Sequence, residues 1–279
     1  MTLLAVVELG RGPMPLDVPV LHADDEGVLR GRAVFETLRV YGGTPFRLRE
    51  HLARLAASAS RVDLPEPDAA GFAAAAADAI AVSGERDLVL RFLWTAGREG
   101  AASPAGFALA SALPPGLEEL RTRGLRVAVI EWAPGALAGA KSTSYAANMA
   151  AQAEAQRRGA DDALLVDPAG TVLEAPTANV WWREGERLLT PTLEQPILAG
   201  ITRAVLVELA PSAGYEVEEG VFRLERLAAA DEVFLSSSVR EVMAVTAIDG
   251  AAVGAGAPGP ASQALERALR AAAGYPLGQ

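Results

Sequence analysis

The spacing of hydrophobic and polar residues predicts strands and helices mixed along the whole chain. Val34–Tyr41 is rich in β-branched and aromatic residues and is followed by a Gly-Gly pair, which is typical of the first strand of a hairpin. The pattern then changes, because between residues 49 and 61 the side chains of Leu52, Leu55 and Ala56 fall on one face of a helix. Stretches with the spacing of a strand and stretches with the spacing of a helix both occur along the rest of the chain.

The other predicted strands are residues 1–10, 44–48, 87–94, 106–111, 125–132, 162–166, 171–174, 179–182, 187–190, 232–238 and 242–248. The other predicted helices are residues 70–82, 145–158, 200–209 and 261–273. Strands and helices do not alternate regularly as βαβ units. The order therefore predicts an α+β fold with largely antiparallel or mixed sheets flanked by helices.

One stretch has the composition of a linker between domains. Leu113-Pro-Pro-Gly116 places two prolines and a glycine directly after a predicted strand. We therefore expect a small N-terminal domain over residues 1–112, a linker over 113–121 and a larger domain over 122–279.

The composition excludes several classes of function. The 279 residues carry a net charge of −10 and 5% aromatic residues, which is unlike a nucleic-acid groove or a partner of anionic membranes. Without cysteine, with two histidines and without a spaced acidic motif, the chain predicts no metal site. The N-terminus lacks a basic leader and no run would span a bilayer, so we expect a cytoplasmic protein.

Lys141 is the only lysine among the 25 basic residues. Arginine serves as well as lysine on a surface, but only lysine can lose its proton when buried and attack a carbonyl. The count alone leaves two interpretations open, a nucleophilic amine or a chance survivor of an arginine-rich composition.

Glu174 gives Lys141 a possible partner, because it ends a predicted strand in an otherwise apolar stretch. A lysine amine and a carboxylate suit pyridoxal phosphate: the amine forms the Schiff base and the acid keeps the pyridine nitrogen protonated. Taken alone, Glu174 could equally be a surface carboxylate at a turn.

Three stretches could bind the phosphate of such a cofactor. Gly200, Ile201 and Thr202 begin a predicted helix, whose N-terminus favours anions. The serines 236–238 end a strand, and Arg47 could supply a fixed cation. By contrast, Gly254-Ala-Gly-Ala-Pro-Gly259 fits a dinucleotide-binding pattern but lies outside any βαβ unit, and we interpret it as a loop before the last helix.

In combination, six segments resemble the class IV aminotransferases, the pyridoxal-phosphate enzymes of fold type IV, which include branched-chain and D-amino acid aminotransferases and aminodeoxychorismate lyases. They cover nearly the whole chain in the family's order. The segments are Val34–Arg39, Phe46–Leu55, Lys141–Tyr145, Leu173–Asn179, Leu198–Arg203 and Ser236–Val242.

The resemblance implies a role for each matching residue. Lys141 forms the Schiff base, and Glu174 pairs with the pyridine nitrogen while Asn179 supports its loop. Leu198 packs on the ring, and Tyr145 lies near the phenolic oxygen. Phosphate binding falls to Arg47, Ile201, Thr202 and Ser238. The family also implies a homodimer acting on small-molecule amino acids and keto acids.

The substrate is less clearly encoded. Phe35, Thr37, Arg98 and Ser237 are the candidate substrate residues, with Arg98 as a carboxylate clamp in the loop after residues 87–94. Three functions remain open at this point. The first is an aminotransferase; the second is an aminodeoxychorismate lyase that gives 4-aminobenzoate and pyruvate; the third is a non-catalytic protein on the same scaffold.

Overall fold

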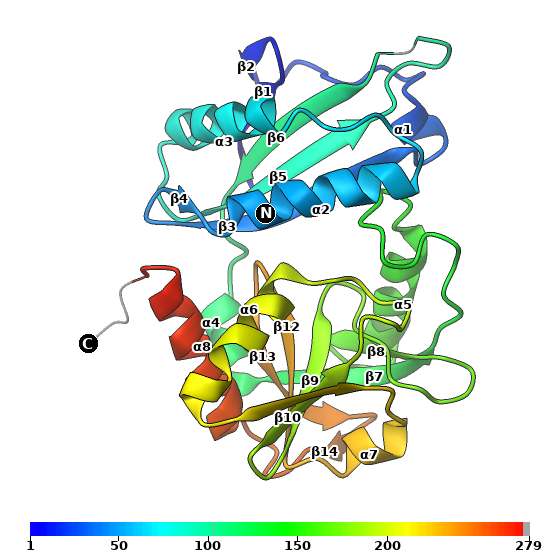
Figure 1. Cartoon of the computed structure of the whole chain (residues 1–279), viewed down its shortest axis with the longest axis vertical. Coiled ribbons are helices and arrows are strands. Elements are labelled where there is room, and N and C mark those ends of the chain that lie inside the picture. The colour runs from blue at the N-terminus through cyan, green and yellow to red at the C-terminus, as the bar shows by residue number, and fades with distance from the viewer. Residues whose placement is uncertain (102, 276–279) are drawn as a thin grey trace. The chain divides into compact units, whose positions relative to one another are not determined.

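The computed structural model describes residues 1–101 and 103–275, which form two compact units (Figure 1). Met1–Pro115 and Gly139–Tyr145 make the first unit, and Gly116–Ala138 and Ala146–Gln279 make the second. The Lys141 segment, which sequence analysis assigned to the C-terminal domain, thus groups with the first unit. No helix in the described part of the chain is long and apolar enough to cross a membrane.

The first unit is an antiparallel sheet with two long helices on one face. The strand order is β2-β1-β6-β5-β3-β4. Its strands are β1 Leu3–Glu8, β2 Gly12–Met14, β3 Ala33–Tyr41, β4 Thr44–Pro45, β5 Leu88–Thr95 and β6 Ala105–Ser111. Its helices are α1 Glu26–Leu29, α2 Leu48–Arg61 and α3 Ala69–Ser83.

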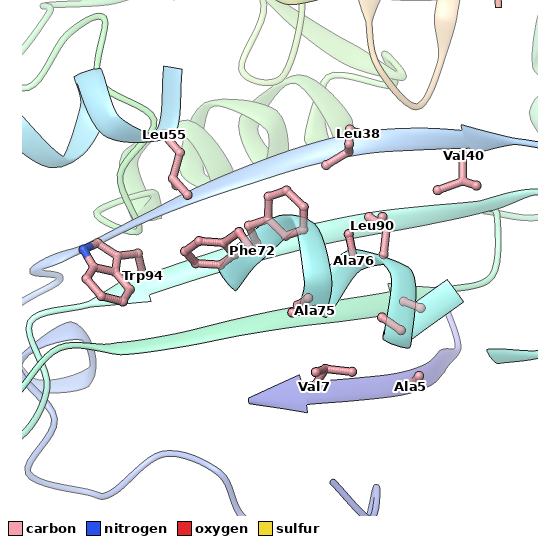
Figure 2. Packing of buried hydrophobic residues seen from close by; sticks show 14 of the residues in the cluster. Ala5, Val7, Leu38, Val40, Leu55, Phe72, Ala75, Ala76, Leu90 and Trp94 are labelled. Carbon is pink, nitrogen blue, oxygen red and sulfur yellow. The ribbon is translucent and has the colours of Figure 1, made fainter. Parts of the chain in front are cut away.

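The core of this unit forms where the helices cover the sheet. Alternate β3 residues, Leu38 and Val40 among them, point towards Leu55 of α2 and Phe72 of α3 (Figure 2). The small side chains of Ala75 and its neighbours let α3 approach the strands closely. The opposite face of the same strands carries Phe35 and Thr37.

The second unit has a mixed sheet in the order β11-β10-β9-β12-β13-β7-β8, with β14 paired to β13. Three of its pairings, β10 with β11, β13 with β7 and β7 with β8, are parallel. Its strands are β7 Leu125–Glu131, β8 Asp162–Val166, β9 Asn179–Glu184, β10 Arg187–Pro191, β11 Glu216–Gly220, β12 Glu232–Ser237, β13 Glu241–Ile248 and β14 Ala251–Ala252. Its helices are α4 Leu117–Arg123, α5 Ala146–Arg157, α6 Ile201–Leu209, α7 Leu224–Ala228 and α8 Pro260–Ala272, with a 3₁₀ turn at Pro211–Ala213.

The α+β expectation is confirmed. The division between the two units falls between Pro115 and Gly116, inside the expected linker, and the second half of that stretch belongs to helix α4. Helix α4 is flanked by Gly116 and Gly124, with acidic residues in its first turn and basic residues in its last. One local expectation, the strand over residues 171–174, is wrong. Residues 171–174 do not form a named strand, because their partners alternate. Leu173 N–H bonds to Leu165 on β8, whereas Val172 N–H bonds to Phe222 in a loop.

Candidate active site

Lys141 lies on a short segment that extends the sheet of the first unit. The amide of Phe35 donates to the carbonyl of Lys141 at 2.9 Å, and that of Thr143 donates to Ala33 at 2.9 Å, so the segment pairs with β3 as an edge strand. The Lys141 amide donates to the Ser58 hydroxyl on α2 at 3.1 Å. The backbone of the lysine is therefore fixed from two elements.

The Lys141 side chain lies against an aromatic ring. Its Nζ lies 4.6 Å from the ring centroid of Phe35, whose edge meets Tyr145 with the centroids 5.5 Å apart. The structure thus brings together three of the predicted residues, all partly buried. The face of an aromatic ring attracts a lysine cation, so the Phe35 ring helps to hold the Lys141 side chain in a defined position.

A buried ionic cluster lies on the other face of β3. Glu36 is fully buried and accepts hydrogen bonds from Nε and Nη2 of Arg54 and from Nδ1 of His51, each at 2.7 Å. Burial alone would raise the pKa of Glu36, but the Arg54 charge and these hydrogen bonds outweigh it and lower the pKa to about 2. Burial lowers the pKa of His51, so this imidazole is neutral at neutral pH and donates to Glu36.

The two predicted arginines of this unit have different surroundings. Arg47 is the residue before α2, in the left-handed conformation with φ 55°, and pairs with Glu50 at 3.1 Å. Arg98 forms a bidentate pair with Asp24 at 2.8–3.0 Å on the exposed surface. The structure does not place Arg98 with Phe35 and Lys141.

Sequence analysis missed a third arginine, Arg91 on β5. It lies directly opposite Thr37 in the register of β3 and β5, so both side chains share the face that carries Phe35. Arg91 is exposed. A charged residue within an otherwise apolar strand was the available signal.

In the second unit, Asn179 joins several predicted residues. Its Nδ2 donates to Glu174 Oε2 at 3.2 Å and to the Leu198 carbonyl at 2.9 Å, and the Leu198 amide donates to the same Oε2 at 3.2 Å. The Glu174 carboxylate is therefore oriented by two donors, which agrees with the expected support from Asn179.

Asn179 also defines the start of α6. Gly200 is the residue before this helix, and a Cβ there would collide with Oδ1 of Asn179, so glycine allows the close approach. No side chain caps this N-terminus, and Ile201 and Thr202 form its first turn. An uncapped helix N-terminus favours an anion.

The strand beside Asn179 leads to the predicted serines. Asn179 on β9 pairs with Ser236 on β12, and the Ser236 hydroxyl accepts from Trp181 Nε1 at 3.0 Å. Ser236 is buried by this contact, whereas Ser237 and Ser238 are only partly buried. Asn179 thus contacts Glu174, Leu198 and Gly200 before α6, and it pairs with the strand that leads to the serine turn.

The stretch Gly254–Gly259, which fits the dinucleotide-binding pattern, lies before α8. A side chain already occupies the N-terminus of that helix. The Glu232 carboxylate accepts from the amides of Ala261 at 3.0 Å and Ser262 at 2.7 Å. Because these two amides already bind a carboxylate, they are not open to a phosphate, which supports the interpretation of residues 254–259 as a loop before the last helix.

Comparisons with known proteins agree on one family. The profile described as Amino-transferase class IV matches residues 33–248. The bifunctional aminodeoxychorismate lyase / D-amino acid transaminase of Mycobacterium tuberculosis is 34% identical over 84% of this chain and 87% of its own. A putative branched-chain-amino-acid aminotransferase of Methanocaldococcus jannaschii is 34% identical over 81% and 82% of the two chains. A solved structure, a hypothetical aminotransferase from M. tuberculosis in its PLP-bound form, superposes with a TM-score of 0.89 at 32% identity, covering 96% and 98% of the two chains.

Proposed function

Because the chain belongs to the class IV aminotransferases, and so moves amino groups between amino acids and 2-keto acids with pyridoxal phosphate, we propose that Lys141 is the lysine that binds this cofactor. The bound cofactor supplies an aldehyde that exchanges amines and a ring that withdraws electrons from the substrate Cα. Lys141 Nζ takes the Cα proton and later returns it. The observation that carries this role is the backbone of Lys141, which is hydrogen-bonded to Phe35 and Ser58 and places Nζ beside the Phe35 ring.

Glu174 binds the pyridine nitrogen in this proposal. The Asn179 side chain and the Leu198 amide both donate to Oε2 of Glu174, and these two bonds orient the carboxylate. Hydrogen bonds to a carboxylate favour its charged form, and a charged carboxylate keeps the pyridine nitrogen protonated. Leu198 packs on the ring, and Tyr145 lies near its phenolic oxygen.

Two helix N-termini of the second unit differ in whether a side chain occupies them, and this difference supports a phosphate site at α6. The α8 terminus is filled by Glu232, whereas the α6 terminus follows a glycine and has no capping side chain. Ile201, Thr202 and Ser238 are therefore the proposed phosphate ligands of this unit. Arg47 remains the proposed phosphate-binding cation that the family resemblance implies.

Borohydride reduction tests the role of Lys141, because it fixes the cofactor to the amine that holds it. We expect one label, on the peptide that contains Lys141, found by mass spectrometry. Lys141→Ala should lose both the label and the visible absorbance. A label on the Met1 amine, or an unchanged spectrum in the variant, would contradict the assignment.

We further propose that Arg91 binds the substrate carboxylate, in place of Arg98. Arg91 shares its sheet face with Phe35 and Thr37, the proposed substrate residues of this unit, whereas the Arg98 guanidinium is paired with Asp24. Arg91→Gln should raise KM for the amino donor about tenfold. Arg98→Gln, the matched control, should change KM less than about twofold. A large rise in KM in Arg98→Gln with little change in Arg91→Gln would instead assign the substrate carboxylate to Arg98.

A lyase activity is the second candidate, because the lyase / D-amino acid transaminase of M. tuberculosis carries both activities at 34% identity. Lys141 and Glu174 can begin either reaction, and Ser237 is a proposed substrate contact in both. Single-turnover absorbance with amino donors and pyruvate release from aminodeoxychorismate separate the two. Pyruvate release with no reactive amino donor would leave the chain as a lyase alone.

We also propose a homodimer. Leu16, Val18, Val28 and Leu29 are exposed hydrophobic residues within one stretch of the first unit. Contact with a second copy would remove them from water. Sedimentation equilibrium should give twice the chain mass, and Val28→Asp should shift the protein towards the monomer.

A further inference from the structure

The turn that joins β12 to β13 has an unusual residue at its end. Ser237 pairs with Glu241, so Ser238, Val239 and Arg240 form a three-residue hairpin loop. Three-residue hairpin loops commonly include one residue in the left-handed conformation, and that residue is usually glycine. In this hairpin the left-handed residue is Glu241, directly after the loop, with φ 58°. A side chain at such a position costs about 1 kcal/mol, so something else must favour it.

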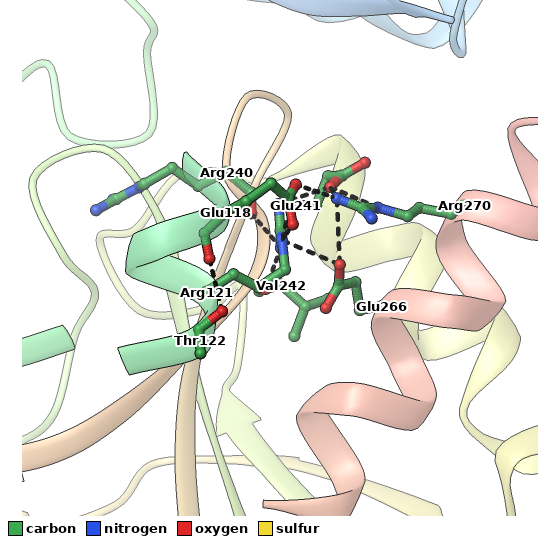
Figure 3. A network of polar contacts seen from close by, with 8 residues as sticks. All are labelled: Glu118, Arg121, Thr122, Arg240, Glu241, Val242, Glu266 and Arg270. Carbon is green, nitrogen blue, oxygen red and sulfur yellow. Dashed lines mark hydrogen bonds and ion pairs between the residues drawn. The ribbon is translucent and has the colours of Figure 1, made fainter. Parts of the chain in front are cut away.

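The Glu241 side chain is fully buried between two arginines (Figure 3). Arg121 of α4 donates from Nη2 at 2.9 Å, and Arg270 of α8 donates from Nε at 3.0 Å and Nη2 at 2.9 Å. These helices lie more than a hundred residues apart in sequence, yet both reach one carboxylate. A buried carboxylate with two such partners holds the backbone that carries it.

Arg121 also binds the backbone of the hairpin directly. Its Nη1 donates to the Val242 carbonyl, directly after Glu241, at 3.0 Å. On the other side, Arg240 donates to Asp162 at 2.6 Å and to the Thr177 hydroxyl at 2.8 Å. Both sides of the turn are therefore tied, while Ser237 and Ser238 at its tip remain partly exposed.

We propose that Glu241, held by Arg121 and Arg270, is a positioning residue that keeps the Ser237–Arg240 turn in the conformation that presents Ser238 to the cofactor phosphate. This inference rests on the proposed role of Ser238. It explains why a buried charge occupies a place where glycine would be unstrained. A fixed turn offers its donors without first losing conformational freedom, so phosphate binding is stronger.

The test compares binding of pyridoxal phosphate with binding of pyridoxal, which lacks the phosphate. The variants are Glu241→Gln, which removes the charge, and Glu241→Gly, which removes the charge and relieves the backbone. The matched control is Glu118→Gln, because Glu118 pairs with the same two arginines but is exposed. Dissociation constants are measured on apoprotein by tryptophan fluorescence, with the ³¹P chemical shift of the bound phosphate and the apoprotein Tm as further measurements.

We expect both Glu241 variants to weaken pyridoxal phosphate binding about tenfold and to shift the ³¹P signal, while pyridoxal binding and the Glu118→Gln values stay within about twofold. A lower Tm with an unchanged ratio of the two dissociation constants would make Glu241 structural only. If Glu241→Gln does not fold, Glu241→Gly decides, and wild-type affinity in it overturns the inference. Wild-type protein that binds no pyridoxal phosphate would instead overturn the proposed function.

Discussion

At the scale of single residues, Glu36 is a fully buried charge of the first unit. It accepts three hydrogen bonds from Arg54 and His51, two side chains of α2. Glu36→Gln leaves the Arg54 guanidinium without its ionic partner, and we expect a loss of about 3 kcal/mol in the free energy of unfolding at neutral pH. Urea unfolding measures this, with the exposed ion-pair residue variant Glu99→Gln as the control. Equal effects in both variants would contradict the prediction.

The same cluster predicts acid sensitivity. The pKa of Glu36 lies at about 2 in the folded chain against an ordinary 4.5, so its stabilisation is complete above pH 4.5 and is lost as the pH falls towards 2. The pKa of His51 is lowered from 6.5, so the unfolded chain takes up this proton first and stability also declines below pH 6.5. Tm should therefore fall with pH below 6.5, and Glu36→Gln should flatten the part below 4.5. A wild-type Tm that rises on acidification would contradict this.

Gly200 gives a prediction based on close approach. Its φ of −68° suits any residue, so only the contact with Asn179 requires glycine. Gly200→Ala should displace Asn179 from Glu174 or shift the start of α6, and weaken pyridoxal phosphate binding about tenfold. The control is Gly135→Ala, because an added Cβ at Gly135 meets open space and its φ is not positive. Unchanged binding in Gly200→Ala would show that the two groups can move apart without loss.

At the scale of elements, α8 depends on Glu232 from β12. Its carboxylate accepts from two buried amides in the first turn of the helix. Glu232→Ala should lower the free energy of unfolding by about 3 kcal/mol, because both amides lose their partner. Glu232→Gln keeps an accepting oxygen and should lose less. Equal losses in the two variants would assign the effect to charge and not to capping.

Most elements were predictable because their residues follow a single period. The residues of β3 are typical of a strand and the apolar residues of α2 recur at helical spacing, and the bounds of both elements agree with the prediction within a residue. Residues 171–174 were not, because their backbone divides its bonds between β8 and a loop, which no local pattern records. Helix α4 was missed because two prolines and a glycine precede it, although its flanking glycines and charge order were visible.

The proposed site residues could be chosen from the sequence, but the residues that hold them in place could not. Lys141 and Glu174 stand out by residue type and by family resemblance. Ser58 and Glu241 do not, because a serine on a helix and a glutamate after a turn are ordinary in sequence. The roles of these two residues depend on contacts with residues far away in the sequence, such as the hydrogen bond between Ser58 and Lys141.

At the scale of the whole molecule, the first unit is discontinuous. Gly139–Tyr145 belongs to it, although the chain before and after belongs to the second unit. Hydrogen exchange in increasing denaturant should therefore show this segment losing protection together with β3 and not with α5, which follows it directly. Loss together with α5 would contradict the grouping.

This arrangement decides how the enzyme could be divided. A cut between Pro115 and Gly116 gives one fragment that contains Phe35 and Ser58 but no lysine, and a second fragment that contains Lys141 without the β3 strand with which it pairs. Neither fragment could fix the cofactor properly by itself. Return of the visible colour on mixing would report that seven residues of one fragment had been inserted beside β3 of the other, which makes the chain a natural basis for a split reporter.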